Sequence, residues 1–381
     1  MITNIINRGD RPLFNRKYLM ALVWLLPIAI VLLSRLNTSD SGQMERLGPS
    51  QLWMLSDRNA VTLYFSQGSG LTSNDKARQA LLLEGLDLRL STPEVIQLLE
   101  EQHWIVRPQL SSLTTQLQIE SKGQVDIAAL QRLLDLLKQP PAIDWAEPIE
   151  RITAQSYLAA QNGRQRAIDS MLSSADPGPL AARTYVELVD RPIKLLFEGM
   201  EAPDALALTN KAQLNRVLQG KTTVAVRGQN ASTLVSWRLE APTTAHSYLA
   251  QQTLGLLLSD QLTNQANLRL QQQLSPEGSL LLLEGNMNEE ALTTLVTGLQ
   301  PDRAQIETAI SKLEQRWRQA TDARPSSWPE VILLFTLEPQ SLSSAFESLR
   351  DNPSEIELAF EVLQEPADRR ARIFTAVSDE S

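Results

Sequence analysis

Apolar residues recur along this chain at two spacings, one typical of strands and the other typical of helices. The run Ala60–Gly70 (AVTLYFSQGSG) is β-branched and aromatic before it becomes glycine-rich, which predicts a strand followed by a turn. Residues 74–90 carry apolar positions at helical spacing, and residues 113–120 (LTTQLQIE) alternate as a half-buried strand does. The first half is therefore predicted to combine strands with amphipathic helices.

The second half of the chain shows a similar order of patterns. The predicted elements are a helix at 207–219, a strand at 221–230, a long helix at 247–274, a strand at 278–286, helices at 288–299 and 302–320, and a last strand at 368–377. Interleaved strands and long helices predict an α+β fold, with helices packed on one face of each sheet. We place the two domains at residues 51–200 and 201–381.

Several helix boundaries can be predicted from capping residues. Asn74 is a candidate N-cap for the helix at 74–90. Ser91 is a candidate N-cap for the next helix, with Pro93 in the first turn and Glu94 at the capping-box spacing. A long helical stretch after residue 143 is predicted to break at Asn162-Gly163.

The N-terminal region predicts a membrane anchor. The segment Tyr18–Ser34 is uncharged, and four basic residues precede it against one acidic residue. The positive-inside rule then places residues 1–17 in the cytoplasm and the bulk of the chain across the membrane. We expect this membrane to be a bacterial inner membrane, with the bulk of the chain in the periplasm. A cleaved signal peptide is the alternative, although no small-residue cleavage site follows the segment. Polar residues 35–50 predict a tether.

The composition of the chain argues against several kinds of partner, catalytic site and metal site. The net charge is −9, which disfavours a nucleic-acid partner because phosphate binding needs a basic face. There is no cysteine, which excludes disulfides, thiol catalysis and cysteine-bound metals. Only two histidines occur in 381 residues, so a histidine-based catalytic metal site is not expected. No cofactor is predicted, since phosphate-binding and nucleophile-elbow motifs are also missing from the sequence.

The order and spacing of these elements resemble the insulinase-like (M16) peptidases from about residue 50 to residue 381. The stretches YFSQGSG (64–70) and LLLEGLDLRLSTPEVIQLLEE (81–101) resemble the glycine turn, the zinc-motif helix and the helix after it. The stretches at 129–140 and 149–167, 221–230 and 254–282 are similar to later elements of that family. The resemblance implies two homologous-type α/β sandwich halves of the insulinase and LuxS-like metalloenzyme fold, after one transmembrane helix.

The resemblance also implies where a zinc site would lie. In the family, two histidines and a glutamate form the motif H-x-x-E-H, where the histidines bind zinc and the glutamate activates water. The corresponding residues here are Leu81, Glu84 and Gly85, and a third ligand falls at about Ala154 or Gln155. One carboxylate cannot hold zinc, which needs about three protein ligands. The family's substrate-holding Arg and Tyr are likewise missing from the matching stretch QQQLSPEG (271–278).

Other candidate residues favour structural roles. His103 is predicted in a turn between a helix and a strand, and His246 is predicted to be exposed after a loop. Glu100 and Glu101 are predicted to form a solvated helix end. Trp328, in ARPSSWPEV, either faces a partner or closes a core.

Three functional hypotheses follow. The first is a catalytically inactive, membrane-anchored pseudo-peptidase that acts as a non-catalytic subunit or peptide-binding partner of a zinc-bearing M16 homologue. The second is a stand-alone periplasmic scaffold or regulatory interaction protein that keeps only the fold. The third is an active peptidase with an unusual site.

Overall fold

A computed structural model gives the fold for most of the chain. It describes residues 43–172, 179–208, 226–227, 233–262, 268–287, 289–364 and 371–377. The predicted anchor, Tyr18–Ser34, lies outside these ranges, as do most of the predicted helix 207–219 and of the predicted strand 221–230. Among the residues within these ranges, no helix combines the length and the apolar character needed to cross a bilayer.

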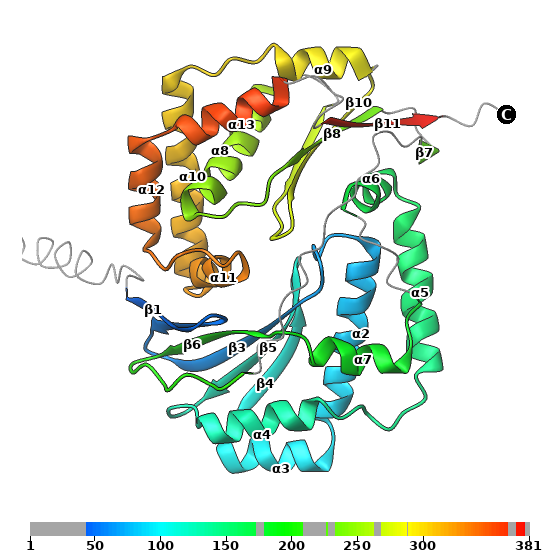
Figure 1. Cartoon of the computed structure of the whole chain (residues 1–381), viewed down its shortest axis with the longest axis vertical. Coiled ribbons are helices and arrows are strands. Elements are labelled where there is room, and N and C mark those ends of the chain that lie inside the picture. The colour runs from blue at the N-terminus through cyan, green and yellow to red at the C-terminus, as the bar shows by residue number, and fades with distance from the viewer. Residues whose placement is uncertain are drawn as a thin grey trace, which may run out of the picture.

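The first sheet has six strands in the order β1-β2-β6-β3-β5-β4 (Figure 1). Their bounds are β1 Met44–Gly48, β2 Gln51–Leu55, β3 Asn59–Ser66, β4 Ile105–Leu110, β5 Thr114–Ser121 and β6 Lys194–Gly199. Neighbouring strands run antiparallel except β2 and β6, which are parallel. The helices of this half are α2 Ser73–Leu90, α3 Pro93–Gln102, α4 Ile127–Leu137, α5 Ala146–Ala160, α6 Gly163–Leu172 and α7 Ala182–Val189.

The second sheet has five strands in the order β7-β11-β8-β10-β9. Their bounds are β7 Val226–Arg227, β8 Thr233–Leu239, β9 Arg269–Gln273, β10 Ser279–Gly285 and β11 Ala371–Val377. The helices of this half are α8 Ala245–Leu262, α9 Glu289–Thr297, α10 Arg303–Ala323, α11 Ser327–Leu334, α12 Leu342–Asp351 and α13 Ser354–Gln364. The described residues thus form two mixed units, which confirms the predicted α+β class.

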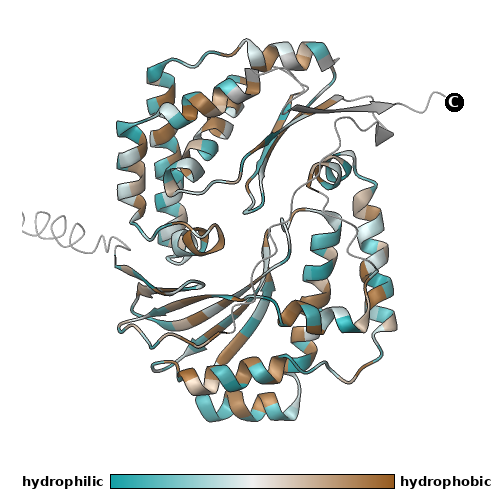
Figure 2. Cartoon of the chain, in the orientation of Figure 1, coloured by the Kyte–Doolittle hydropathy of each residue, from teal (hydrophilic) through white to brown (hydrophobic). Residues whose placement is uncertain are grey.

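Each sheet packs one face against helices of its own half. In the first sheet, Val61 and Leu63 of β3 pack with Leu82 and Leu86 of α2. In the second sheet, β8 and β10 pack in the same way against α8, α9 and α13. Figure 2 shows hydrophobic residues along the strands of both sheets and along the helices that cover them. Val61 and Leu63 lie two residues apart and so point to the same face of β3, as the two-residue period of a strand predicts.

The opposite face of each sheet packs against a helix of the other half. Tyr64 and Leu196 of the first sheet lie in one buried cluster with Trp328 of α11. Leu280 of β10 lies in another with Ile168 of α6. Figure 1 shows α11 beside the first sheet and α6 beside the second. Since each fully buried large apolar side chain contributes about 1.5–3 kcal/mol, these reciprocal contacts fix the two halves to each other.

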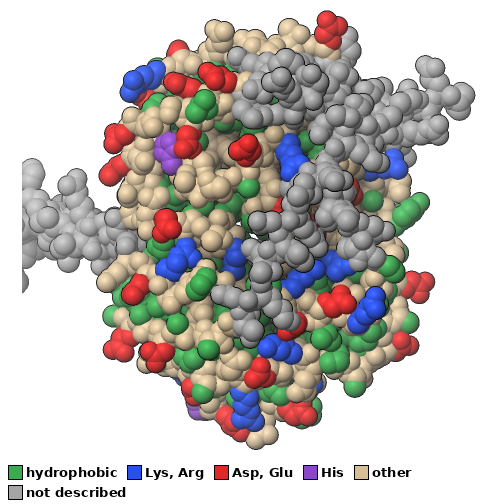
Figure 3. Space-filling model, in the orientation of Figure 1, with side chains coloured by type: hydrophobic (Ala, Val, Ile, Leu, Met, Phe, Trp, Pro, Cys, Tyr) green, Lys and Arg blue, Asp and Glu red, His purple; other side chains and the backbone are tan. Residues whose placement is uncertain are grey.

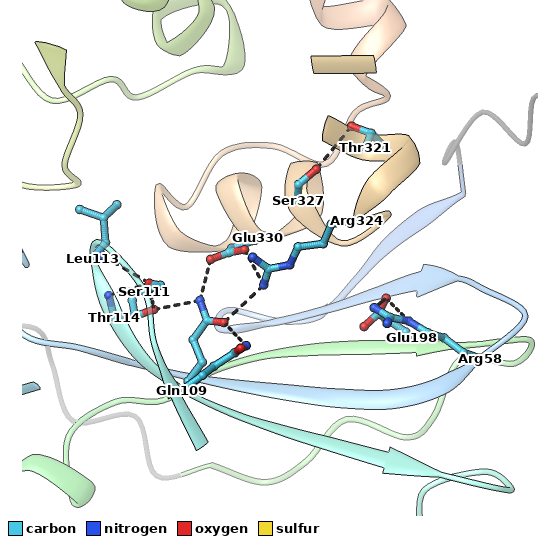
Figure 4. Close-up of polar contacts among 11 residues, drawn as sticks. Arg58, Gln109, Ser111, Leu113, Thr114, Glu198, Thr321, Arg324, Ser327 and Glu330 are labelled. Atoms are coloured by element: carbon cyan, nitrogen blue, oxygen red, sulfur yellow. Dashed lines mark hydrogen bonds and ion pairs between the residues drawn. The ribbon is translucent and has the colours of Figure 1, made fainter. Parts of the chain in front are cut away.

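A polar contact between the halves accompanies this packing (Figure 4). Gln116 on β5 donates from Nε2 to Glu330 Oε1 on α11 at 2.8 Å. Arg324 lies 3.0 Å from the other oxygen of Glu330 and also reaches the Gln116 side-chain oxygen. Burial raises the pKa of Glu330, and the Arg324 charge and the Gln116 hydrogen bond oppose that rise. The carboxylate therefore joins the halves while being partly removed from water.

Some predicted boundaries were wrong. The N-cap of α2 is Thr72, whose side chain accepts a hydrogen bond from the Asp75 backbone N–H at 3.0 Å, and Asn74 lies inside the helix. The N-cap of α3 is Thr92, with Pro93 in the first turn as predicted, and Ser91 instead caps the end of α2. Runs of adjacent polar residues offer several capping side chains, so the pattern alone does not select one.

Two longer segments also differ from the predictions. In place of the single helix predicted over residues 247–274, the described residues form α8, Ala245–Leu262, and then β9, Arg269–Gln273, which pairs with β10. The glutamine-rich run suits a helix locally, but pairing with a buried strand overrides that preference. The predicted tether at 35–50 overlaps β1, Met44–Gly48, while the predicted strand with its glycine turn and the break at 162–163 are confirmed.

Candidate functional site

Helix α2, which carries the motif-like positions, is fixed at its N-terminus by two features. The turn before it uses left-handed backbone at Gly68 and Gly70, and a Cβ at Gly70 would lie 2.5 Å from the Leu113 carbonyl oxygen. The Asp169 carboxylate of α6 then accepts hydrogen bonds from the Ser73 backbone N–H and hydroxyl, each at 2.7 Å. A negative group at a helix N-terminus is favourable, so α6 holds α2 in place.

Leu81, at the first motif position, is fully buried in the core of the first half. Its neighbours in that core are apolar side chains of the sheet and of adjacent helices. A histidine at this position would bring a polar ring into an apolar cluster, which costs free energy unless the ring finds partners. The position is therefore built for packing.

Gly85, at the second motif position, lies against an aromatic side chain. A Cβ added to Gly85 would lie 2.2 Å from Cδ2 and 2.4 Å from Cε2 of Tyr185, and 3.1 Å from a ring carbon of Trp145. Tyr185 is fully buried, donates from its hydroxyl to the Leu137 carbonyl oxygen at 2.7 Å, and has its ring centroid 5.7 Å from that of Trp145. The ring of Tyr185 thus takes the space that a second ligand side chain would need.

Glu84, the one carboxylate of the motif-like positions, is paired with a cation. Its Oε2 lies 2.9 Å from an Arg151 guanidinium nitrogen on α5, and both side chains are partly exposed. Burial raises the pKa of neighbouring Asp87, and the Glu84 charge raises it further. The Arg151 guanidinium thus supplies positive charge beside the Glu84 carboxylate.

The third-ligand positions do not supply a carboxylate. Ala154 and Gln155 are exposed residues on α5, three and four positions after Arg151 and so on the same side of the helix. The described residues also contain no group of three or more His, Asp or Glu side chains close enough to hold a metal ion. At the two positions where the resemblance predicts histidine ligands, the chain has Leu81 and Gly85, whose side chains cannot bind zinc, so the residues present do not fit the metal there.

The other candidates from the sequence occupy separate places. His103 ends α3 in left-handed conformation and is exposed. His246 was predicted to be exposed but is only 15% accessible, because its ring contacts Glu355 at 3.1 Å and the Asn352 carbonyl oxygen at 2.8 Å. Trp328 is fully buried and donates to the Gln340 carbonyl oxygen at 2.9 Å, which decides for the core role. Glu100 and Glu101 are exposed at the end of α3, as predicted.

The stretch that matches the substrate-holding residues of the family forms β9 and the turn after it. The Gln272 side chain there packs on Gly255 of α8 and donates to the Gln251 carbonyl oxygen. The Gln272 amide nitrogen is thus already hydrogen-bonded to another residue of the chain.

Sequence reasoning missed Arg151, Trp145 and Tyr185, which lie far from the motif-like helix in the sequence. Only Gly85 signalled them, because a glycine inside a helix costs about 1 kcal/mol relative to alanine and often marks a close approach. Which side chain packs against Gly85 depends on tertiary packing, and no pattern near Gly85 in the sequence indicates that it is Tyr185.

Comparison with known proteins gives matches among solved structures alone. No protein-family model matches the sequence, and no curated protein matches it. The chain is similar to a peptidase M16 inactive domain from Pseudomonas fluorescens, with TM-score 0.57, 13% identity and coverage of 89% of this chain and 100% of that one. It is also similar to a putative M16-like peptidase from Alicyclobacillus acidocaldarius, with TM-score 0.55, 14% identity and coverage of 89% and 98%.

A third similar structure is longer. The chain matches the periplasmic protease PqqL from Escherichia coli with TM-score 0.53 and 13% identity, over 88% of this chain and 47% of that one. Identities this low establish the fold alone. Over the 88–89% of its length that these structures cover, the chain therefore has the fold of the insulinase-like (M16) peptidases.

Proposed function

We propose that the chain is a catalytically inactive unit of the M16 type, anchored in the bacterial inner membrane by residues 18–34. Its bulk lies in the periplasm, and it acts as a non-catalytic subunit or peptide-binding partner of a zinc-bearing M16 peptidase.

The packing at Gly85 carries this proposal. The buried Tyr185 ring lies within 2.4 Å of where a side chain would begin, and the first motif position is a fully buried leucine. The remaining carboxylate, Glu84, is neutralised by Arg151. With no ligand set there is no metal-activated water, so hydrolysis would depend on another chain.

Two comparisons support a role beside a catalytic unit. One similar structure is described as an inactive M16 domain. The match to PqqL spans 47% of that chain, so a protein of this size corresponds to about half of that protease. A second chain carrying the zinc motif would supply the other half.

Strand β4 supports a role in peptide binding. It is the terminal strand of the first sheet, paired among the described residues with β5 alone, and it packs beside α2. Ile105 and Leu110 are 54% and 49% accessible. An extended peptide added to such an edge gains main-chain hydrogen bonds and apolar contacts with alternate side chains.

The absence of the family's Arg and Tyr from residues 271–278 favours the second candidate function, a stand-alone periplasmic scaffold. In that case the fold serves binding to envelope proteins without a peptidase.

Affinity purification of the full-length chain from its native membranes, with mass spectrometry, separates the two candidates. The matched control is the segment 1–42 fused to an unrelated periplasmic domain, which reports capture through the anchor alone. Stoichiometric recovery of a protein with an H-x-x-E-H motif, lacking in the control, is the expected result. Recovery of unrelated envelope proteins alone, or of the chain by itself, would remove the subunit proposal and leave the scaffold.

A further inference from the structure

A cavity of about 490 Å³ lies in the second half, between α8, α10 and β9. Its apolar wall includes Leu256 of α8, Leu270 of β9, and Leu313 and Trp317 of α10. This volume is in the range of cavities that bind small molecules or single side chains with their backbone. The cavity is therefore large enough for a ligand with an apolar body.

Hydrogen bonds hold the polar wall of the cavity in one arrangement. Trp317 donates from its indole nitrogen to the Gln252 side-chain oxygen at 2.6 Å. The Gln252 nitrogen in turn contacts the Tyr248 hydroxyl at 3.2 Å. The ring of Tyr248 meets that of Trp317 edge to face at a centroid distance of 6.3 Å. A wall fixed in advance loses little entropy when a ligand binds.

Among the described residues that line this cavity, Arg316 is the one with a charged side chain. The other basic residues of α10 are paired: Arg303 with Glu307, Lys312 with Asp260, and Arg318 with Glu314. Arg316 is exposed, and no acidic side chain of the described residues forms an ion pair with it. Its guanidinium is thus available to a carboxylate, which it can bind through two parallel hydrogen bonds.

A second cavity of about 350 Å³ shares Gln252, Gln272, Trp317 and Ser327 with the first. It continues toward the turn between β4 and β5, at Ser112 and Leu113, and is lined by one acidic residue, Glu330. Figure 4 shows Leu113 and Glu330 on the two sides of the junction between the halves. The two adjoining cavities therefore have a cation beside the first and a carboxylate beside the second.

We propose that the first cavity binds the carboxyl terminus of a polypeptide whose last residue is apolar, with the apolar side chain beside Trp317 and the terminal carboxylate on Arg316. This proposal rests on the proposed peptide-binding function and names the part of the peptide that is recognised.

Two physical arguments favour a chain terminus over an internal acidic residue. Successive side chains of an extended chain point to opposite sides, so an apolar residue and an adjacent acidic one cannot both enter this cavity. A terminal residue carries its apolar side chain and its carboxylate on one α-carbon. The preceding residues would lie in the second cavity, where the Glu330 carboxylate is already paired with Arg324.

Binding of a peptide carboxyl terminus in the first cavity can be measured by fluorescence anisotropy on the full-length chain in lipid nanodiscs. The probe is a hexapeptide labelled at its amino terminus and ending in alanine and leucine, compared with the same peptide amidated at its carboxyl terminus. We expect the free acid to bind at least about tenfold more tightly than the amide, as for loss of a charged hydrogen bond. Arg316→Gln should remove this difference, while Arg318→Gln, two residues away and paired with Glu314, should preserve it.

Two further measurements complete the test. Ala320→Trp, which fills the first cavity from α10, should abolish binding of the free acid. Octanoate, an apolar acid without a peptide bond, should compete poorly. Equal binding of acid and amide, an unchanged preference in Arg316→Gln, or competition by octanoate as effective as that of the peptide would each overturn the proposal. Recovery of the zinc-bearing partner with Arg316→Gln, measured separately, shows whether the proposed subunit function stands on its own.

Discussion

The close contact between Gly85 and Tyr185 predicts that the smallest possible side chain at position 85 destabilises the protein. The substitution Gly85→Ala would place a Cβ 2.2 Å from Cδ2 of Tyr185, well inside ordinary van der Waals distance. The ring cannot retreat freely, because its hydroxyl is bonded to Leu137 and Trp145 lies beside it. Either the ring moves and loses the hydrogen bond, or α2 moves away from α7.

The size of the effect follows from three contributions. Overpacking a well-filled core costs about 1–3 kcal/mol. Displacing the buried Tyr185 hydroxyl from Leu137 costs about 1 kcal/mol more. Alanine is a better helix former than glycine by about 1 kcal/mol, which offsets part of the cost. We therefore expect Gly85→Ala to lower the free energy of unfolding by about 1–3 kcal/mol.

Thermal unfolding of the full-length chain, followed by tryptophan fluorescence, measures this. A loss of 1–3 kcal/mol corresponds to a drop in Tm of roughly 2–10 °C for a domain of this size. Gly123→Ala is the matched control, since a Cβ there meets nothing within 4 Å. In a Tyr185→Leu background the same substitution at Gly85 should cost less, as coupled neighbours require. A Gly85→Ala protein as stable as the parent would show that Tyr185 leaves room for a larger side chain at position 85, and the close contact would then not exclude a ligand there.

Three further effects are expected, each readable from Tm. Trp328→Ala should lower the free energy of unfolding by about 3–5 kcal/mol, because it removes a buried side chain at the contact between the halves. Tyr157→Ala, at a side chain that is 67% accessible, should change it by less than about 0.5 kcal/mol. Equal effects of the two substitutions would contradict the reciprocal packing. The raised pKa of Glu330 means that the folded chain holds this proton more tightly than the unfolded chain does, so its contribution to stability falls as pH rises above about 4.5, and Glu330→Gln should flatten that part of the profile. Burial lowers the pKa of Lys194 from 10.5 to about 8, so the free energy of unfolding of the parent protein should rise as pH increases between these values. If Lys194→Met shows the same rise, Lys194 is not its cause.

Local pattern identified those elements whose hydrophobic periodicity agrees with their capping and turn residues, but not β1, β2, β6, β8, α7 or the helices α11 to α13. Strand β3 with its glycine turn, helix α10 and the break at Asn162-Gly163 all follow from residues close in sequence. The end of α8 and the existence of β9 did not, because Arg269–Gln273 suit a helix and become a strand only by pairing with β10.

The candidate site was predictable in a more limited way. The sequence shows that no histidine stands near Leu81 and Gly85, but it does not show what fills the space. Tyr185 arrives there from α7, a hundred residues later, through packing that no local pattern encodes. The packing of α6 on the second sheet and of α11 on the first sheet was unpredictable for the same reason, because it joins apolar faces from residues far apart in the sequence.

The proposed lack of a functional zinc site in this M16-type fold is tested by the zinc content of the purified protein. The full-length chain, purified without a histidine tag, is saturated with zinc and dialysed, and its metal content is measured by mass spectrometry. We expect far less than one zinc per chain, because the two histidines of the sequence, His103 and His246, lie outside the motif-like positions and the space beside Gly85 is filled by Tyr185. One tightly held zinc per chain, lost on substitution of Glu84 by Gln, would contradict it.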